Sequence, residues 1–93
     1  MLTLRIGSDT CVKDAAGAIA GQLRESGSAR LQAIGAAAVN QTVKAIALAG
    51  VFFKEDGRLV LSNVERCEVK VNGQQRTGLR WRVIAVQVGE VMR

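Results

Sequence analysis

Basic side chains are concentrated in one short part of this 93-residue sequence. Residues 66–82 hold five basic residues and one acid, Glu68, and so carry a formal charge of +4 out of a chain total of +5. The basic residues are Arg66, Lys70, Arg76, Arg80 and Arg82. Clustered cations attract phosphate groups, and a nucleic acid is a polyanion that neutralises them. The alternative is a solvated arginine face that protects a sheet edge from unwanted pairing.

The residue types that most enzymes need are scarce. The chain has no His, which is the commonest acid–base residue near neutral pH, and its eight carboxylates are scattered. Cys11 and Cys67 lack the paired spacing of zinc ligands, and we expect both to be buried, reduced thiols. We therefore expect no enzyme, cofactor, metal or small-molecule substrate.

The length predicts one domain, residues 1–93, with a single modest core. No stretch approaches the roughly 18 consecutive apolar residues of a membrane span. The first residues lack the basic and apolar segments of a secretory signal, so we expect a cytoplasmic protein that binds no membrane.

Hydrophobic periodicity predicts the order strand, helix, strand, helix, strand, strand. The expected elements are a strand over 2–6, a helix over 12–26, a strand over 29–34, a helix over 36–53, a strand over 59–71 and a strand over 76–83. The expected buried stripe of the second helix is Val39, Val43, Ile46, Gly50 and Phe53. Phe52, Phe53 and Trp81 are expected in the core, which leaves no aromatic platform for base stacking.

Asn72-Gly73 predicts a hairpin between the last two strands. A two-residue turn would pair Val69 with Arg76 and mix apolar and basic faces, whereas a loop that includes Gln74 pairs Val69 with Thr77. We therefore expect the longer, odd-numbered loop. In that register Arg66, Lys70 and Arg80 point away from the helices, and Cys67, Val69 and Leu79 face them.

The central run Gln32-Ala-Ile-Gly-Ala-Ala-Ala-Val-Asn-Gln-Thr-Val-Lys-Ala45 resembles the stage V sporulation protein S family. Supporting similarities are Ala16-Gly-Ala-Ile-Ala-Gly21 and Arg76-Thr77, and the resemblance spans roughly residues 2 to 84. That family is related in fold to Alba, a chromatin protein of archaea, and to the C-terminal domain of translation initiation factor three. The resemblance implies an α/β (α+β) two-layer sandwich, βαβαββ, with a mixed four-stranded sheet in the order 1-2-4-3 and both helices on one face.

The resemblance also implies binding of DNA or RNA, a role in sporulation or cell development, and dimers or larger homo-oligomers. The uncovered sheet face and the apolar segment from Ile84 to Val91 predict a homodimer or tetramer. The residues that match the family pattern are Gln32, Gly35, Asn40, Gln41, Lys44 and Arg76. The first loop departs from that pattern, because it carries Asp9 and its only cation is Lys13. The candidate nucleic-acid-binding residues are Lys13, Lys44, Arg66, Lys70, Arg76, Arg80 and Arg82. For Asn40 and Gln41 the alternative is a buried polar pair that ties the helix to a loop.

Two functions compete at this point. The first is a nucleic-acid-binding regulatory protein that contacts mainly phosphates and is weakly sequence-selective. The second is a homo-oligomeric interaction module in sporulation or septation, which binds no nucleic acid and uses the small-residue second helix and the apolar tail from Ile84 to Val91. A hydrolase or transferase is disfavoured by the missing acid–base residues.

Overall fold

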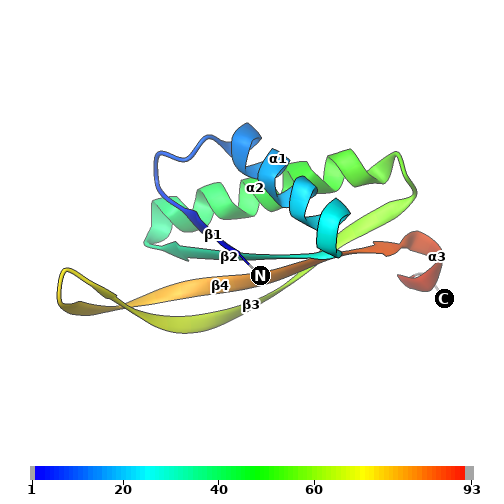
Figure 1. The fold of residues 1–93 in the computed structure, drawn as a ribbon. Coiled ribbons are helices and arrows are strands. Elements are labelled where there is room, and N and C mark those ends of the chain that lie inside the picture. The colour runs from blue at the N-terminus through cyan, green and yellow to red at the C-terminus, as the bar shows by residue number, and fades with distance from the viewer. Residues whose placement is uncertain (1, 92–93) are drawn as a thin grey trace.

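The computed structural model describes residues 2–91 and has the expected element order (Figure 1). The elements are β1 (Thr3–Ile6), α1 (Val12–Ser26), β2 (Ser28–Ile34), α2 (Ala36–Lys54), β3 (Arg58–Val71), β4 (Gln74–Gln87) and the short α3 (Val88–Val91). The four strands form one sheet in the order β1-β2-β4-β3, in which β1 and β2 are parallel and the other pairs antiparallel. Helices α1 and α2 cover one face of the sheet, and we call the other face the open face (Figure 1). The predicted two-layer sandwich and its strand order are confirmed.

Helix α1 and strand β2 follow their hydrophobic periods closely. The buried side of α1 is Ala15, Ala16, Ile19, Ala20 and Leu23. The helix ends where Gly27 takes a φ of 84° and donates its backbone N–H to the carbonyl of Leu23 at 2.9 Å. In β2, Ala29, Leu31 and Ala33 are buried and alternate with half-buried residues. Every second residue of β2 therefore projects from the open face.

Helix α2 buries only part of the expected stripe: Phe53 is buried and Val39 and Ile46 pack half-buried against the core, but Val43 is exposed. Its buried residues are Ala38, Thr42, Ala45, Ala49 and Phe53, whereas Val43 is 53% exposed and Phe52 is 38% exposed. Small side chains let the helix axis approach the sheet closely, so alanines rather than the larger valines face inward. The buried Thr42 hydroxyl donates a hydrogen bond to the Ala38 carbonyl at 2.8 Å, which satisfies its polar group within the helix.

Helix α2 has an apolar composition, although Asn40, Gln41 and Lys44 interrupt it. An 18-residue window of this 19-residue helix has a mean hydropathy of 1.4, so the helix is long and apolar enough to cross a membrane by length and composition alone, and 28% of that window is buried. Ala45 and Ala49 are fully buried in the core of the domain. Val43 and Val51 add an exposed apolar side. The composition of α2 therefore reflects both its contact with the core and this exposed side.

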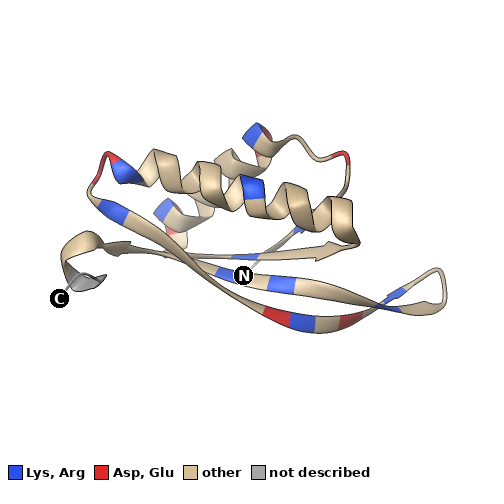
Figure 2. Ribbon diagram, turned by 180° about the vertical axis from the view of Figure 1, so that it is seen from behind, with Lys and Arg blue, Asp and Glu red and all other residues tan. Residues whose placement is uncertain are grey.

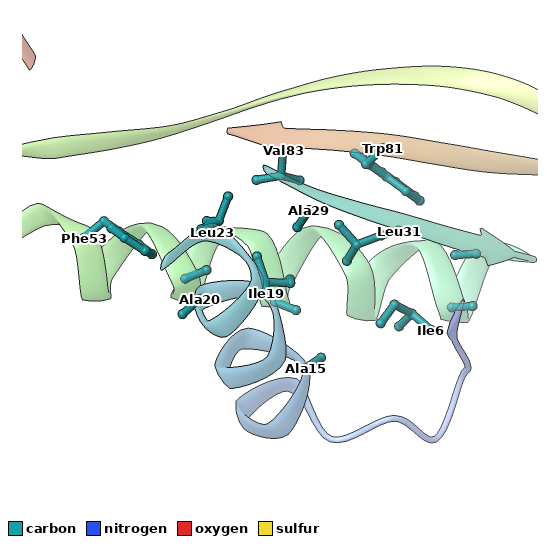
Figure 3. Packing of buried hydrophobic residues seen from close by; sticks show 14 residues of the cluster. Ile6, Ala15, Ile19, Ala20, Leu23, Ala29, Leu31, Phe53, Trp81 and Val83 are labelled. Atoms are coloured by element: carbon teal, nitrogen blue, oxygen red, sulfur yellow. The ribbon is translucent and has the colours of Figure 1, made fainter. Parts of the chain in front are cut away.

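The core lies between the helices and the sheet (Figure 3). Phe53, Ile19 and Leu23 are among its largest fully buried side chains. Trp81, with 4% of its surface exposed, belongs to this core as expected. The guanidinium groups of Arg24 and Arg58 lie 4.9 and 5.1 Å from the centre of the Phe53 ring, so two cations cover the ring.

The hairpin between β3 and β4 has a two-residue turn, and the expected odd-numbered loop is wrong. Asn72 and Gly73 have φ values of 52° and 79°, and Val69 pairs with Arg76. Two positive φ values give a turn whose twist matches that of the strands, which outweighs the mixing of side-chain faces. The mixing costs little because this end of the hairpin extends beyond the helices (Figure 1).

The observed register places several residues of β3 on the sheet face opposite to the predicted one. Residues opposite each other across two strands share a face, so Arg66 shares the helix side with its partner Leu79. By the same alternation Lys70 points to the helix side, and Cys67 and Val69 project from the open face. The predictions for Arg80 and Leu79 are confirmed, whereas those for Arg66, Lys70, Cys67 and Val69 are wrong.

The surroundings of the two cysteines differ from expectation. Cys11 is exposed and Cys67 is half-buried, so neither is the buried thiol that was expected. Cys11 precedes α1 directly, where the chain leaves a surface loop. The tail continues β4 to Gln87 and then turns into α3.

Candidate nucleic-acid interface

The open face of the sheet carries most of the net charge of the protein. Alternation along the strands puts one arginine of β1, one of β2 and three of β4 on this face, together with one acid from β3. They are Arg5, Arg30, Arg76, Arg80, Arg82 and Glu65. The face therefore has a formal charge of +4, against +5 for the whole chain. Figure 2 marks the charged positions on the strands and the helices.

Strand pairing arranges the polar side chains of this face in two rows that run across the sheet. The first row is Arg5, Gln32, Arg80 and Glu65, and the second is Thr3, Arg30, Arg82 and Asn63. We call these residues the polar grid. Neighbouring strands are about 4.8 Å apart, and the rows are separated by two residues, or roughly 6.8 Å. Several guanidinium groups can thus reach one bound phosphate chain.

Within the polar grid, Arg30 and Arg82 lie directly opposite each other on β2 and β4. Arg80 has an acidic neighbour, because one of its guanidinium nitrogens is 4.0 Å from a carboxylate oxygen of Glu65. Neither Arg30 nor Arg82 has an acid within 4.0 Å among residues 2–89, whose side chains the structure describes. Arg30, Asn63, Glu65, Arg80, Trp81 and Arg82 line a single hollow. Two like charges facing each other across a ladder are unfavourable, so this hollow attracts an anion.

A second hollow lies where the open face meets the hairpin. It is lined by Arg5, Ile6, Gln32, Ala33 and Ile34 of β1 and β2 and by Val69, Lys70, Val71 and Asn72 of the hairpin. Gly78, which pairs with Ile34 and with Cys67, has no side chain to fill the space between them. A Cβ on Gly78 would lie 3.1 Å from the Ala33 carbonyl oxygen and 3.1 Å from Cγ1 of Ile34. Glycine at this position therefore allows the strands to pack closely beside the hollow.

The structure separates the predicted binding residues into groups. Arg76, Arg80 and Arg82 lie on the open face. Arg66 points to the helix side, where a guanidinium nitrogen lies 3.8 Å from a Glu68 carboxylate oxygen. Lys70 also points to the helix side, although it lines the hollow at the hairpin.

The remaining predicted cations belong to the helical layer. Lys13 is exposed on α1 and Lys44 is exposed on α2. Both helices cover the sheet face opposite to the polar grid (Figure 1). Within one chain, Lys13 and Lys44 therefore do not share a continuous surface with the arginines of β4.

The central motif has mainly structural contacts. The Gln41 side-chain amide donates a hydrogen bond to the Thr10 carbonyl at 3.0 Å, which ties α2 to the first loop. Asn40 is exposed and Gln41 is half-buried, so the alternative of a buried polar pair is wrong, although Gln41 does tie the helix to the loop. Gly35 takes a φ of 90° between β2 and α2, and a guanidinium nitrogen of Arg76 is 4.0 Å from the position its Cβ would occupy. Gln32 is the motif residue that belongs to the polar grid.

The sequence interpretation missed Arg5, Arg30 and Asn63. Arg5 stands between Leu4 and Ile6, and Arg30 stands between two buried residues of β2, so alternation alone places both on the open face. Together with the strand order 1-2-4-3, this alternation predicts that Arg5 and Arg30 lie on the same face as the arginines of β4, with Arg30 on the strand next to β4. Asn63 is found only from the hairpin register, in which it pairs with Arg82.

Comparisons with known proteins agree with this architecture. A search of solved structures finds Alba from Thermoplasma volcanium at a TM-score of 0.56 and 9% sequence identity, covering 92% of this chain and 100% of that one. The fold is thus Alba-like. The family model of stage V sporulation protein S matches residues 2–86, which is nearly the whole chain. The chain therefore belongs to the stage V sporulation protein S family.

Proposed function

We propose that this protein is a nucleic-acid-binding regulatory protein that acts in sporulation or cell development. The observation that carries the proposal is the polar grid, in which Arg30 and Arg82 face each other without an acidic partner among the described residues. The family name supports the sporulation role, and the Alba-like fold supports the ligand class. In this proposal the protein is cytoplasmic, is no enzyme and assembles as a homodimer or tetramer.

Binding in this proposal runs through phosphates. A guanidinium group presents paired N–H donors that match two phosphate oxygens, so arginine suits phosphate recognition better than lysine does. The arginines of the polar grid are exposed or half-buried and are free to reach a ligand above the sheet. Contacts of this kind set position and orientation on the ligand but carry little base-sequence information.

The test measures affinity for nucleic acid over a range of salt concentrations. The double variant Arg30→Gln, Arg82→Gln should weaken binding and flatten the log–log salt dependence, by about 0.9 per lost phosphate contact on duplex DNA and about 0.7 on a single strand. The matched control is Lys13→Gln, Arg66→Gln, which removes the same charge outside the polar grid. If both double variants lose the same affinity for nucleic acid, the polar grid is not the binding site. If the wild-type protein binds no nucleic acid even at low salt, the proposed function is wrong.

The second candidate function is a homo-oligomeric interaction module that binds no nucleic acid. The specific observation in its favour is the exposed apolar side of α2, where Val43 is 53% and Val51 is 59% exposed. Apolar side chains in such a row lower the free energy of a complex when a partner covers them. Sporulation-partner binding that survives loss of the arginines and is lost on Val51→Lys would favour this function.

A further inference from the structure

The polar grid of the open face lies between two partly apolar hollows. At the hairpin end, the hollow that contains Arg5 and Gln32 also exposes Ile34, Val69 and Val71. At the opposite end, a hollow lined by Leu61, Ser62, Asn63, Arg82 and Ile84 begins where the polar grid ends. Leu61 and Ile84 pair across β3 and β4 and are 41% and 38% exposed. Apolar and cationic side chains therefore alternate along the same face.

This alternation matches the chemistry of an unpaired strand. A duplex offers phosphates on its outside and keeps the faces of its bases stacked within. A single strand offers both phosphates and unstacked bases, and proteins bind it with a cationic groove that follows the backbone and with apolar surfaces for the bases. The aliphatic residues of the two hollows supply apolar surface although the face has no exposed aromatic ring.

The shape of the hairpin end favours the same ligand. Residues of β1 and β2 and residues of the hairpin line one hollow, although β4 separates these strands in the sheet. The face is therefore hollowed at this end, with Arg5 and Lys70 among the lining residues. A convex, rigid duplex would touch only the rim of such a hollow, whereas a flexible strand can enter it.

We propose that the open face binds single-stranded nucleic acid, with phosphates on the polar grid and unpaired bases in the two flanking hollows. This proposal rests on the proposed function and adds to it the strand state of the ligand. It also assigns a role to apolar residues that phosphate contacts alone leave unexplained. Val69 and Ile84 serve as base-contacting residues, one in each hollow.

The experiment compares ligands that differ in one property at a time. A single-stranded oligonucleotide, its duplex with the complementary strand, and an abasic single strand of equal phosphate number are titrated at the same salt concentration. We expect the single strand to bind about tenfold more tightly than the abasic strand, the size of one or two base contacts. The duplex should also bind more weakly than the single strand.

Variants separate the base contacts from the charge contacts. Val69→Thr and Ile84→Thr keep β-branched side chains on the strands but make the hollows more polar. Each should weaken single-strand binding about threefold, without changing the salt slope, because no phosphate contact is lost. The matched control is Val64→Thr, since Val64 is 50% exposed but pairs with Trp81 on the helix side.

The outcomes distinguish this proposal from the proposed function. If the duplex and the abasic strand bind as tightly as the single strand, the protein binds only phosphates, and the assignment of bases to the hollows is overturned. If Val64→Thr weakens binding as much as the other two variants, the hollows are not the site. If no polyanion is retained at low salt, the proposed function itself fails.

Discussion

Arg30 and Arg82 lie directly opposite each other in the β2–β4 ladder, on the sheet face that no helix covers. Like charges in such a cross-strand pair cost stability, by roughly 0.2–1 kcal/mol. The same pair is the part of the polar grid without acidic neighbours in the described chain. The protein therefore keeps a locally unfavourable arrangement at the position where an anionic ligand would relieve it.

The first prediction concerns stability. Arg82→Gln should raise the free energy of unfolding by a few tenths to about 1 kcal/mol at low salt, because it removes the repulsion from Arg30. The gain should shrink as added salt screens the charges. Urea denaturation at two ionic strengths measures both effects, with Arg66→Gln on the helix side as the control. A gain that is independent of salt would show that repulsion is not its cause.

The second prediction concerns Glu65, the acid at the edge of the polar grid. Its carboxylate is 4.0 Å from Arg80, and 61% of its side chain is exposed. Glu65→Gln should therefore strengthen nucleic-acid binding about two- to threefold, because it frees Arg80 for phosphate and removes a like charge from the ligand's path. Stability should change by less than about 0.5 kcal/mol, since the pair is exposed.

The control for Glu65 is Glu68→Gln, which makes the same change of charge on the helix side of β3. Glu68 is near Arg66 and accepts a hydrogen bond from Thr77 at 3.2 Å, so it also has local partners. Fluorescence anisotropy with a labelled oligonucleotide compares the two variants. Equal gains in affinity would mean that the binding depends on net charge rather than on the open face.

The third prediction concerns two glycines in contrasting surroundings. Gly78→Ala should destabilise the protein by about 1–3 kcal/mol, because its Cβ would lie 3.1 Å from a backbone oxygen and 3.4 Å from the sulfur of Cys67. Gly17 lies inside α1, and apart from its chain neighbours and the nearby backbone of its own helix, nothing lies within 4 Å of an added Cβ. Gly17→Ala should stabilise the protein by about 0.5–1 kcal/mol. Thermal unfolding of both variants shows whether the two effects have opposite signs.

The sequence predicts the buried side of a helix or strand well where the core leaves only one side of that element apolar. In α1 and β2 the buried residues repeat at the expected spacing, because one side of each element faces the core. In α2 the spacing is ambiguous, since alanines and valines both fit an apolar stripe, and only close packing against the sheet selects Ala45 over Val43. Propensity therefore predicts the helix but not its rotation.

The register of the hairpin decides which residues of the candidate site can be assigned to a sheet face from the sequence. Apolar side chains share one face of β4 where the core covers it, as Trp81 and Val83 do. Beyond the helices no core enforces this alternation, and the Asn72-Gly73 turn decides the pairing. The sheet face of Arg80 and Arg82 can be predicted because buried residues stand next to them in the sequence. Arg66 has no buried neighbour in the sequence, so its face cannot be predicted in this way.

The last prediction concerns assembly and the exposed side of α2. Val43 and Val51 are eight residues apart and are both more than half exposed, so they lie on neighbouring parts of one helix surface. A partner that covers this surface removes apolar area from water. The expected homodimer or tetramer should therefore dissociate in Val51→Lys, because a desolvated ammonium group in an apolar contact is costly.

Light scattering at micromolar concentration measures this effect. The wild-type protein should have at least twice the mass of one chain, and Val51→Lys should be monomeric with an unchanged circular dichroism spectrum. The control is Val64→Lys, which introduces the same charge at a residue 50% exposed on β3. A monomeric wild-type protein, or dissociation of both variants alike, would contradict assembly through α2. Because the polar grid lies on the opposite layer, loss of assembly should weaken nucleic-acid binding only by removing the second copy of the site.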